Sequence, residues 1–457
     1  MNSFYKKSPA WLKNSLITAY NLLAYFKRYG GNYRKYRALF QQRNNWSYND
    51  LKNDQKERYK ALINYAIANS PFYASLYSGI DNPDAIENIS SLPIVSKEML
   101  RREIEKVYTI PKSKAIISKT GGTTGKSLQV FYTYDNFQER FALLDNFRNV
   151  SGYKLGKRTA WFSGKSLLSQ SDIEKKCFWR TDSWYHIRYY STFHLKKEFL
   201  SFYIENLKKF RPEFLVGFPS NMYEIAKYGL ANNFDFPENT IKAIFPTAET
   251  VTDHSREVIE KFFKAKVFDQ YASSEGAPFI FECHQGKLHL EMQSGVFEVL
   301  DDENNSTNDG RLVVTSFTTY GTPLIRYDIG DNIILSNQTC TCGNNNPLVN
   351  KILGRIDDFV YSPENGKINL GNISNTLKDT KGIIKFQVEQ NSLQTIVIKM
   401  VADREDYTND VEKIFIKNWR DRIGEDMSLK IKYVEEIPVA KSGKFRLVIN
   451  NIKHLLE

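Results

Sequence analysis

The stretch Ser118-Lys119-Thr120-Gly121-Gly122-Thr123-Thr124-Gly125-Lys126-Ser127 concentrates glycine, hydroxyl and lysine residues in one loop. Glycines let backbone N–H groups approach an anion closely, hydroxyls add hydrogen-bond donors, and lysines add positive charge. A Walker A loop has four residues between its glycines and a helix after it. Here Gly121 and Gly125 enclose three residues, and the β-rich runs Ala115–Ile117 and Leu128–Tyr132 flank the loop. We therefore predict a phosphate-binding loop between two strands, with a flexible hairpin tip as the alternative.

The residues around this loop indicate an α/β domain. Short β-rich runs alternate with amphipathic helical stretches, as where the helical pattern of Val258 to Phe263 precedes the strand-like Lys266–Phe268. The stretch Val296–Phe317 has the pattern of a hairpin. Upstream, a helical pattern around Leu62 ends at Ser70-Pro71.

After Gly354 the pattern restarts with strand-like runs and a helix around Trp419. We predict an α/β fold class, with a large mixed-sheet N-terminal domain and a smaller, mobile α+β C-terminal domain. The predicted bounds are 1–50 for a basic helical extension, 51–356 for the large domain and 357–457 for the small domain.

Further segments follow the loop in an order that resembles the adenylate-forming superfamily. They are Pro246–Thr250, Tyr271–Gly276, Tyr320–Asp331, Gly354–Asp358 and Pro438–Arg446. Other sequence segments resemble the phenylacetate–CoA ligase and CapK-like branch of that superfamily. These are Leu62–Ala66 followed by Ser70–Tyr73, Gly217–Ser220 and Arg326–Asp328.

The resemblance implies an enzyme that uses ATP and Mg²⁺ to activate a carboxylate as acyl-AMP, releases pyrophosphate and transfers the acyl group. The attack of one anion on another requires positive charge near the α-phosphate. By resemblance, Glu275 binds magnesium, Lys444 contacts the carboxylate and the α-phosphate, and Asp357 is the hinge between the domains. The other catalytic candidates are Thr120, Thr123, Thr124 and Lys126. The ATP-binding candidates are Ser118, Gly121, Gly122, Gly125, Ala248, Glu249, Tyr271, Ser274, Asp331 and Arg355.

An acyl pocket is expected from the order of segments along the superfamily fold. Its candidates are Trp161, Phe162, Ser163, Gly217, Phe218, Pro219 and Thr247. Each aromatic residue among them has packing in the core as its alternative.

Three cysteines and one histidine form a candidate structural zinc site, made of Cys283, His289, Cys340 and Cys342. Three thiols and an imidazole complete a tetrahedral set, although Cys-x-Cys differs from the usual Cys-x2–4-Cys spacing. A similar set recurs in CapK-like relatives. His284 is a competing ligand, and ordinary reduced cysteines are the alternative interpretation. We expect Cys177 to serve in packing or at the surface.

Positive charge is concentrated at the N-terminus. The net charge is +11, and nine lysines and arginines precede Asp50, the first acidic residue. Apolar residues such as Trp11, Ile17 and Phe26 lie among them at roughly helical spacing. One interpretation is peripheral contact of residues 1–45 with an anionic membrane, and the slightly favoured one is a docked helix with a solvated basic face. Nucleic-acid binding is less favoured than either.

With four cysteines and neither a signal peptide nor a long apolar run, we expect a cytoplasmic protein, peripheral at the inner face of the membrane if residues 1–45 bind lipid. We favour activation of a small-molecule or sugar carboxylate for cell-surface polysaccharide assembly, as in CapK-like proteins. An aryl-acid CoA ligase is the alternative, and a non-catalytic membrane- or nucleic-acid-binding scaffold is the hypothesis from another class. The acceptor of the acyl group is the thiol of CoA, an amine or a hydroxyl, and the sequence does not distinguish among the three.

Overall fold

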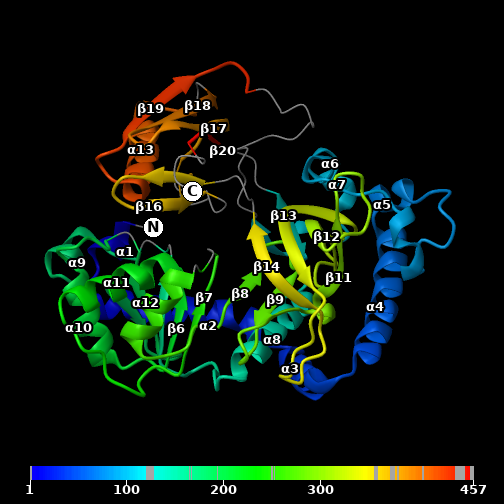
Figure 1. The fold of residues 1–457 in the computed structure, drawn as a ribbon, viewed down its shortest axis with the longest axis horizontal. Helices are drawn as coiled ribbons and strands as arrows, with labels where there is room; N and C mark the ends of the chain where they lie inside the picture. Colours follow the sequence, from blue (N-terminus) through cyan, green and yellow to red (C-terminus); the bar gives the residue numbers. More distant parts are fainter. Residues whose placement is uncertain are drawn as a thin grey trace. The chain divides into compact units, whose positions relative to one another are not determined.

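A computed structural model of the chain describes residues 3–119, 128–163, 165, 167–192, 194–248, 251, 253–354, 359–370, 376–377, 380–403, 406–437 and 448–452. The chain divides into two compact units (Figure 1). Unit 1 comprises residues 1–117, 131–329 and 333–351, and unit 2 comprises 118–130, 330–332 and 352–457. The predicted α/β class is confirmed, whereas the predicted boundary at residue 357 lies outside the described residues.

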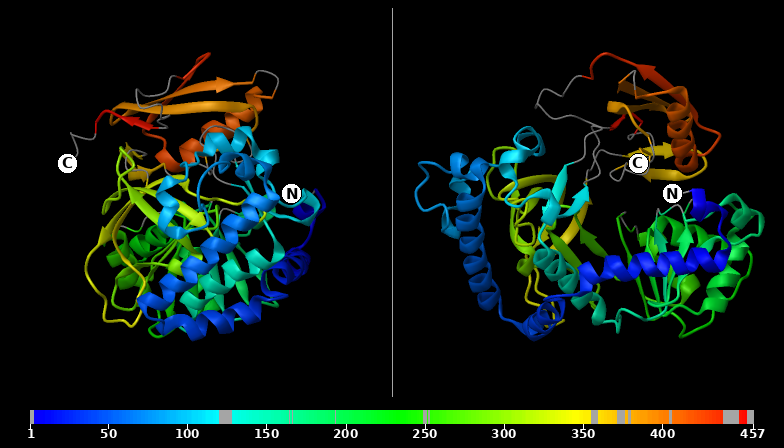
Figure 2. Two further views of the ribbon diagram at one scale, coloured as in Figure 1. Left: turned by 90° about the vertical axis from the view of Figure 1, so that its right-hand side faces the viewer. Right: turned by 180° about the vertical axis from the view of Figure 1, so that it is seen from behind.

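A parallel sheet with helices on both faces forms one part of unit 1. Its order is β4 (Trp179–Asp182), β5 (Ile187–Ser191), β3 (Thr159–Ser163), β6 (Phe214–Gly217) and β7 (Ala243–Pro246), with β4 antiparallel to β5. Helices α10 (Leu200–Phe210), α11 (Pro219–Ala231) and α12 (Asp253–Phe263) cover one face, and α8 (Tyr134–Asn149) and α2 (Ala10–Tyr29) cover the other (Figure 2).

The alternation of side chains along the strands explains the two covered faces. On β6, Leu215 packs with the α10–α12 core, while Phe214 and Val216 pack with Phe147 of α8. Because successive strand residues point to opposite faces, a run with few polar residues buries both sides of a parallel sheet. The predicted helix from Val258 onward is confirmed as α12.

A second, largely antiparallel sheet forms the rest of unit 1. Its order is β11 (Gly295–Leu300), β12 (Asp309–Ser316), β13 (Tyr327–Ser336), β14 (Leu348–Gly354), β10 (Leu288–Leu290), β9 (Phe279–Glu282) and β8 (Gln270–Ala272). Strands β11 and β12 pair antiparallel, which confirms the hairpin predicted over Val296–Phe317.

Helix α4 (Tyr48–Asn69) begins at the capping box of Ser47 and Asp50 and ends before Pro71, where α5 (Pro71–Leu76) starts, as predicted. It packs along β11, since the Gln55 side-chain amide donates to the backbone oxygen of Gly295 at 2.7 Å. The shorter elements are α1 (Ser3–Lys7), α3 (Tyr33–Gln42), η1 (Arg43–Asn45), η2 (Ile86–Ser91), α6 (Lys97–Arg102), α7 (Ile104–Val107), η3 (Lys112–Lys114), β1 (Ile116–Lys119), β2 (Gln129–Tyr132), α9 (Gln170–Glu174) and η4 (Met292–Ser294).

Unit 2 contains an α+β core. Its sheet has the order β19 (Ser428–Tyr433), β18 (Thr395–Ala402), β17 (Ile383–Ser392) and β20 (Val448–Asn450), and β15 (Phe359–Ser362) pairs with β16 (Gly366–Asn369). Helix α13 (Asn409–Ile423) buries Phe415 and Trp419 against Phe386 and Met400 of the sheet. The strands and the helix predicted for this region are confirmed.

Helix α2 docks on the parallel sheet with an orientation that the sequence did not predict. Its buried side carries Lys13, Ile17, Asn21 and Tyr25. Its solvent side is largely apolar, and Phe26 is 76% exposed. The expectation of a docked helix is confirmed, but the expectation of a basic solvent face is wrong for most of its length. Among the described residues, no helix combines the length and the apolar character needed to cross a bilayer.

Candidate functional site

The turn that carries Glu275 joins β8 to β9 and is held by hydrogen bonds to its backbone. The Tyr132 phenol donates to the Ser274 carbonyl oxygen at 2.8 Å, and the Arg140 guanidinium donates to the Ser273 carbonyl oxygen at 2.6 Å. Burial raises the pKa of Tyr132 to about 12, so the phenol keeps its donor proton at neutral pH. Glu275 itself is buried on this turn.

Glycine is required at position 276. Its φ of +90° lies in the left-handed region, and a Cβ there would stand 2.6 Å from Cγ2 of Thr319. The Thr318 hydroxyl donates to the Gly276 carbonyl oxygen at 3.0 Å. A side chain at this position would therefore push the Glu275 turn away from the loop after β12.

The segment from Tyr320 onward holds the strand that follows the phosphate loop. The Thr322 hydroxyl oxygen accepts from the Phe131 backbone N–H at 2.8 Å. Farther along, the Arg326 guanidinium pairs with both carboxylate oxygens of Glu298, its Nη2 lying 2.7 Å from Oε1, and also donates to the Ser90 carbonyl oxygen. Arg326 therefore connects β11 to the segment around Ser90 and stabilises the fold. Asp331, one of the predicted ATP-binding residues, is half-buried on β13.

Six of the predicted acyl-pocket residues lie at or just beyond the carboxyl ends of β3, β6 and β7, where open α/β sheets bind ligands. A Cβ at Gly217 would stand 2.0 Å from the Phe162 carbonyl oxygen, so the close approach of β6 to β3 requires glycine. Phe162 is fully buried in the core of unit 1, so of the two interpretations, pocket lining and core packing, the structure supports core packing for this residue. Ala248, one of the predicted ATP-binding residues, follows β7 with a φ of +66°.

Several predicted residues lie outside the described residues, so their roles stay predictions. They are Thr120, Gly121, Gly122, Thr123, Thr124, Gly125, Lys126, Glu249, Arg355, Asp357 and Lys444. Ser118 lies on β1, and β1 pairs with β2, so the predicted phosphate loop does connect two paired strands. Tyr271 is on β8, the strand that leads into the turn with Glu275.

The structure brings the four predicted metal ligands together. Their ligand atoms all lie within 4.8 Å of one another. Cys283 follows β9, His289 is on β10, and Cys340 and Cys342 belong to the loop between β13 and β14. His284 is exposed and is not in this group, so among the described histidines the arrangement selects His289.

The distances within this group fit zinc. A tetrahedral ion with Zn–S of about 2.3 Å and Zn–N of about 2.05 Å separates two sulfurs by about 3.8 Å, and a sulfur from a nitrogen by about 3.6 Å. The Cys283 and Cys340 sulfurs are 3.7 Å apart, and the Cys342 sulfur is 3.4 Å from Nε2 of His289. Nδ1 of His289 faces the Asn346 carbonyl oxygen at 3.2 Å. A carbonyl only accepts, so this contact places the proton on Nδ1 and leaves Nε2 for the metal.

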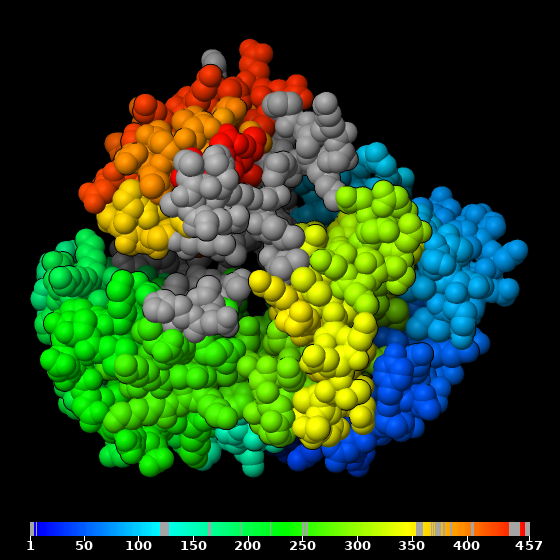
Figure 3. All heavy atoms as spheres, in the orientation of Figure 1, coloured from blue at the N-terminus to red at the C-terminus, as the bar shows by residue number. Residues whose placement is uncertain are grey.

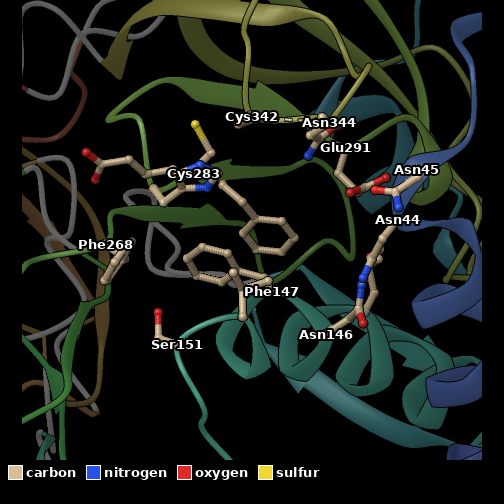
Figure 4. Close-up of a pocket in the computed structure, with 16 residues that line it drawn as sticks. Asn44, Asn45, Asn146, Phe147, Ser151, Phe268, Cys283, Glu291, Cys342 and Asn344 are labelled. Atoms are coloured by element: carbon tan, nitrogen blue, oxygen red, sulfur yellow. Dashed lines mark hydrogen bonds between the residues drawn. The ribbon is translucent and has the colours of Figure 1, made fainter.

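A pocket of about 240 Å³ borders the metal group (Figure 4). The rings of Phe147 and Phe281 stack in it with centroids 4.4 Å apart, and Cys283 and Cys342 are part of its lining. The loop that carries Cys340 and Cys342 lies on the surface beside the segment around Trp46 (Figure 3). The Asn345 side-chain amide of this loop donates to the Trp46 carbonyl oxygen at 2.7 Å. Cys177 is half-buried beside Arg180, away from this group.

Comparison with known proteins places this chain. A family model described as the CapK C-terminal domain matches residues 360–451. Protein CapK of Staphylococcus aureus is 34% identical over 460 residues, which cover 99% of this chain and 100% of that protein. The phenylacetate-coenzyme A ligase of Thermus thermophilus is 25% identical over 333 residues, or 67% of this chain and 70% of that protein.

Solved structures of 2-hydroxyisobutyryl-CoA ligase share the fold. The complex with 2-HIB-AMP and CoA in the thioesterification state has a TM-score of 0.59 at 18% identity, covering 91% of this chain and 93% of that chain. The postadenylation state with R3-HIB-AMP has a TM-score of 0.58 at 17% identity, covering 91% and 92%. The fold is therefore that of 2-hydroxyisobutyryl-CoA ligase. The chain belongs to the CapK family, so the predicted adenylate-forming, CapK-like identity is confirmed.

Proposed function

We propose that this chain activates a carboxylate with ATP and Mg²⁺. A carboxylate oxygen attacks the α-phosphorus of ATP, the bond to the β-phosphate oxygen breaks, and acyl-AMP and pyrophosphate form. The acyl carbon is then attacked by an acceptor, and AMP leaves. The observation that carries this proposal is the buried Glu275 on a turn whose neighbouring backbone is held by Tyr132 and Arg140.

Glu275 suits the role of a magnesium ligand. Carboxylate oxygens are the protein ligands that Mg²⁺ prefers, and the ion would neutralise charge on the phosphates. A ligand fixed before the reaction avoids reorganisation in the transition state. Lys444 would contact the carboxylate and α-phosphate, Asp331 the ribose, and Arg355 the phosphate or ribose, as the family resemblance implies.

The substrate proposal follows the CapK relationship. We favour a small-molecule or sugar carboxylate whose acyl group enters cell-surface polysaccharide, since the full-length relative at 34% identity is a CapK protein. An aryl-acid CoA ligase is the second candidate, supported by the partial match to a phenylacetate-coenzyme A ligase. The two candidates differ in their acceptor, which is a thiol for the CoA ligase.

Domain closure belongs to the same proposal. Residues 357–457 would form a lid that pivots at Asp357, so that one orientation serves adenylation and another serves acyl transfer.

We further propose that Cys283, His289, Cys340 and Cys342 bind structural zinc. Four protein ligands leave no open position for water, so the ion would fix the loop between β13 and β14 to β9 and β10. The short S–S and S–N distances support this assignment.

Carboxylate-dependent ATP–pyrophosphate exchange tests the substrate proposal. Uronic acids, amino acids and aryl acids would be compared with the purified chain. Exchange with uronic or amino acids supports the first candidate, and exchange with aryl acids followed by CoA thioester formation supports the second. A chain that binds ATP but gives no exchange with any acid would support the non-catalytic scaffold instead.

A further inference from the structure

Helix α2 is attached to the parallel sheet through polar side chains. The Lys13 ammonium lies 2.8 Å from Asp172 and 2.6 Å from the Ser169 hydroxyl. The Asn21 amide donates to the Asp182 carboxylate at 2.7 Å and to the Tyr189 hydroxyl at 2.9 Å. Rolling the helix to bury its other side would break these bonds and remove one partner from each of the buried Asp172 and Asp182 carboxylates, which is unfavourable.

The other side of α2 is therefore held in solvent, although it is the more apolar side. At about 100° per residue, its apolar members fall within one half of the helix circumference. We call this set the α2 outer face. Its exposed fractions are 68% for Trp11, 36% for Leu16, 68% for Tyr20, 40% for Leu22, 75% for Leu23 and 76% for Phe26. Seen from behind, α2 runs along the surface of the molecule in front of the sheet it covers (Figure 2).

A neighbouring turn adds a further aromatic ring. Trp184 lies on the turn between β4 and β5 and is 66% exposed. The backbone N–H of Ser183, next to it in the chain, donates to the Thr18 hydroxyl of α2 at 3.1 Å. A further exposed aromatic ring thus lies on a turn that is hydrogen-bonded to α2, and clustered exposed apolar side chains mark candidate interaction sites.

The charges nearby favour one partner over others. No acidic residue precedes Asp50. Lys13, Arg37 and Arg43 of this segment already have partners within unit 1, whereas Lys7, Lys27, Arg34 and Lys35 have exposed side chains. An apolar, aromatic helix face with exposed cations on the same N-terminal segment matches the headgroup and upper acyl region of an anionic bilayer.

We propose that the α2 outer face binds the surface of a membrane that contains anionic lipids, with α2 lying in the plane of the interface. Trp11, Leu23 and Phe26 enter the headgroup and acyl boundary, and the exposed lysines contact lipid phosphates. This peripheral binding does not depend on which carboxylate the enzyme activates.

Vesicle sedimentation of the full-length chain tests the proposal. The probes are vesicles of phosphatidylcholine alone and vesicles with about one third phosphatidylglycerol. We expect binding to the anionic vesicles, and a reduction of about tenfold or more in the partition coefficient for Trp11→Ser/Leu23→Ser/Phe26→Ser. Lys7→Gln/Lys27→Gln should weaken binding by about fivefold or more and make it less sensitive to salt.

A matched control replaces the same number of exposed apolar residues elsewhere, in Tyr48→Ser/Val150→Ser/Ile414→Ser, whose side chains are 44%, 71% and 38% exposed. This control should bind as the wild type does. None of the replaced side chains is buried, so all variants should fold. Thermal unfolding checks this. The proposal is overturned if the wild type ignores anionic vesicles or if the triple α2 variant binds equally well. It is also overturned if the wild type self-associates in sedimentation analysis, the α2 variant does not, and neither binds lipid.

Discussion

The Tyr132 phenol donates a 2.8 Å hydrogen bond to the carbonyl oxygen of Ser274. Tyr132 ends β2, the strand that follows the predicted phosphate loop, and Ser274 precedes Glu275. The bond therefore connects the strand after the predicted phosphate loop with the residue next to the expected magnesium ligand, Glu275. Its importance lies in positioning, because the phenol contacts backbone and not substrate.

Replacing Tyr132 with Phe removes this bond and leaves a carbonyl oxygen without its partner, which costs about 1 kcal/mol. We expect the kcat/KM of pyrophosphate exchange to fall by about fivefold, with a weaker apparent affinity for Mg²⁺. Tyr203→Phe is the control, because its phenol also donates to a buried carbonyl oxygen, that of Ser191, at 2.8 Å. If both variants lose stability and exchange equally, the bond has no special part in the site.

Lys444→Ala should abolish pyrophosphate exchange and leave acyl transfer from supplied acyl-AMP intact. The reason is that the lysine is expected to stabilise charge only in the first half-reaction. Each half-reaction can be measured separately on the purified variant. Exchange at the wild-type rate would remove Lys444 from the mechanism.

Cys342→Ser should lower bound zinc from about one equivalent to a small fraction of it, and should lower the unfolding temperature, because metal binding contributes directly to folding. Metal analysis and thermal unfolding measure the two effects. Cys177→Ser is the matched control, since Cys177 is a half-buried thiol outside the group. Wild-type protein that contains no zinc after purification without chelators would contradict the assignment.

Asp269→Asn should change the pH dependence of stability. Burial, followed by the charge of Glu282, raises the pKa of Asp269 to about 6. The folded state then binds the proton more tightly than the unfolded chain, so this group favours folding at low pH and loses that contribution as pH rises through 6. The variant should gain stability relative to the wild type between pH 4 and 7, on the order of 1 kcal/mol. Denaturant unfolding across that range measures the difference, and parallel curves would show that Asp269 does not titrate this way.

The sequence predicted those elements that are determined by residues close together in the chain. The hairpin of β11 and β12, the end of α4 at Pro71 and the presence of helix α13 all follow from period and turn chemistry. The metal group was also predicted, because few residue types bind zinc and the chain has only four cysteines.

The remainder depends on contacts between distant segments. Arg140 has no sequence signal that connects it to Ser273, which is 133 positions away. The orientation of α2 is a similar case, since apolar residues occur on both of its sides. Asp172 and Asp182, which lie far along the chain, decide that Lys13 and Asn21 face inward. Helical periodicity alone therefore does not predict which side of α2 faces the sheet.

The central claim is that Glu275 supports magnesium-dependent adenylation, and exchange with Glu275→Gln tests it most directly. The wild type should exchange pyrophosphate into ATP only when its carboxylate and Mg²⁺ are both present, and Glu275→Gln should lower the rate by about 100-fold or more. Glu282→Gln, which removes a buried carboxylate paired with Arg256, should retain magnesium-dependent exchange. Exchange by Glu275→Gln at the wild-type rate and with the wild-type magnesium dependence would contradict the account.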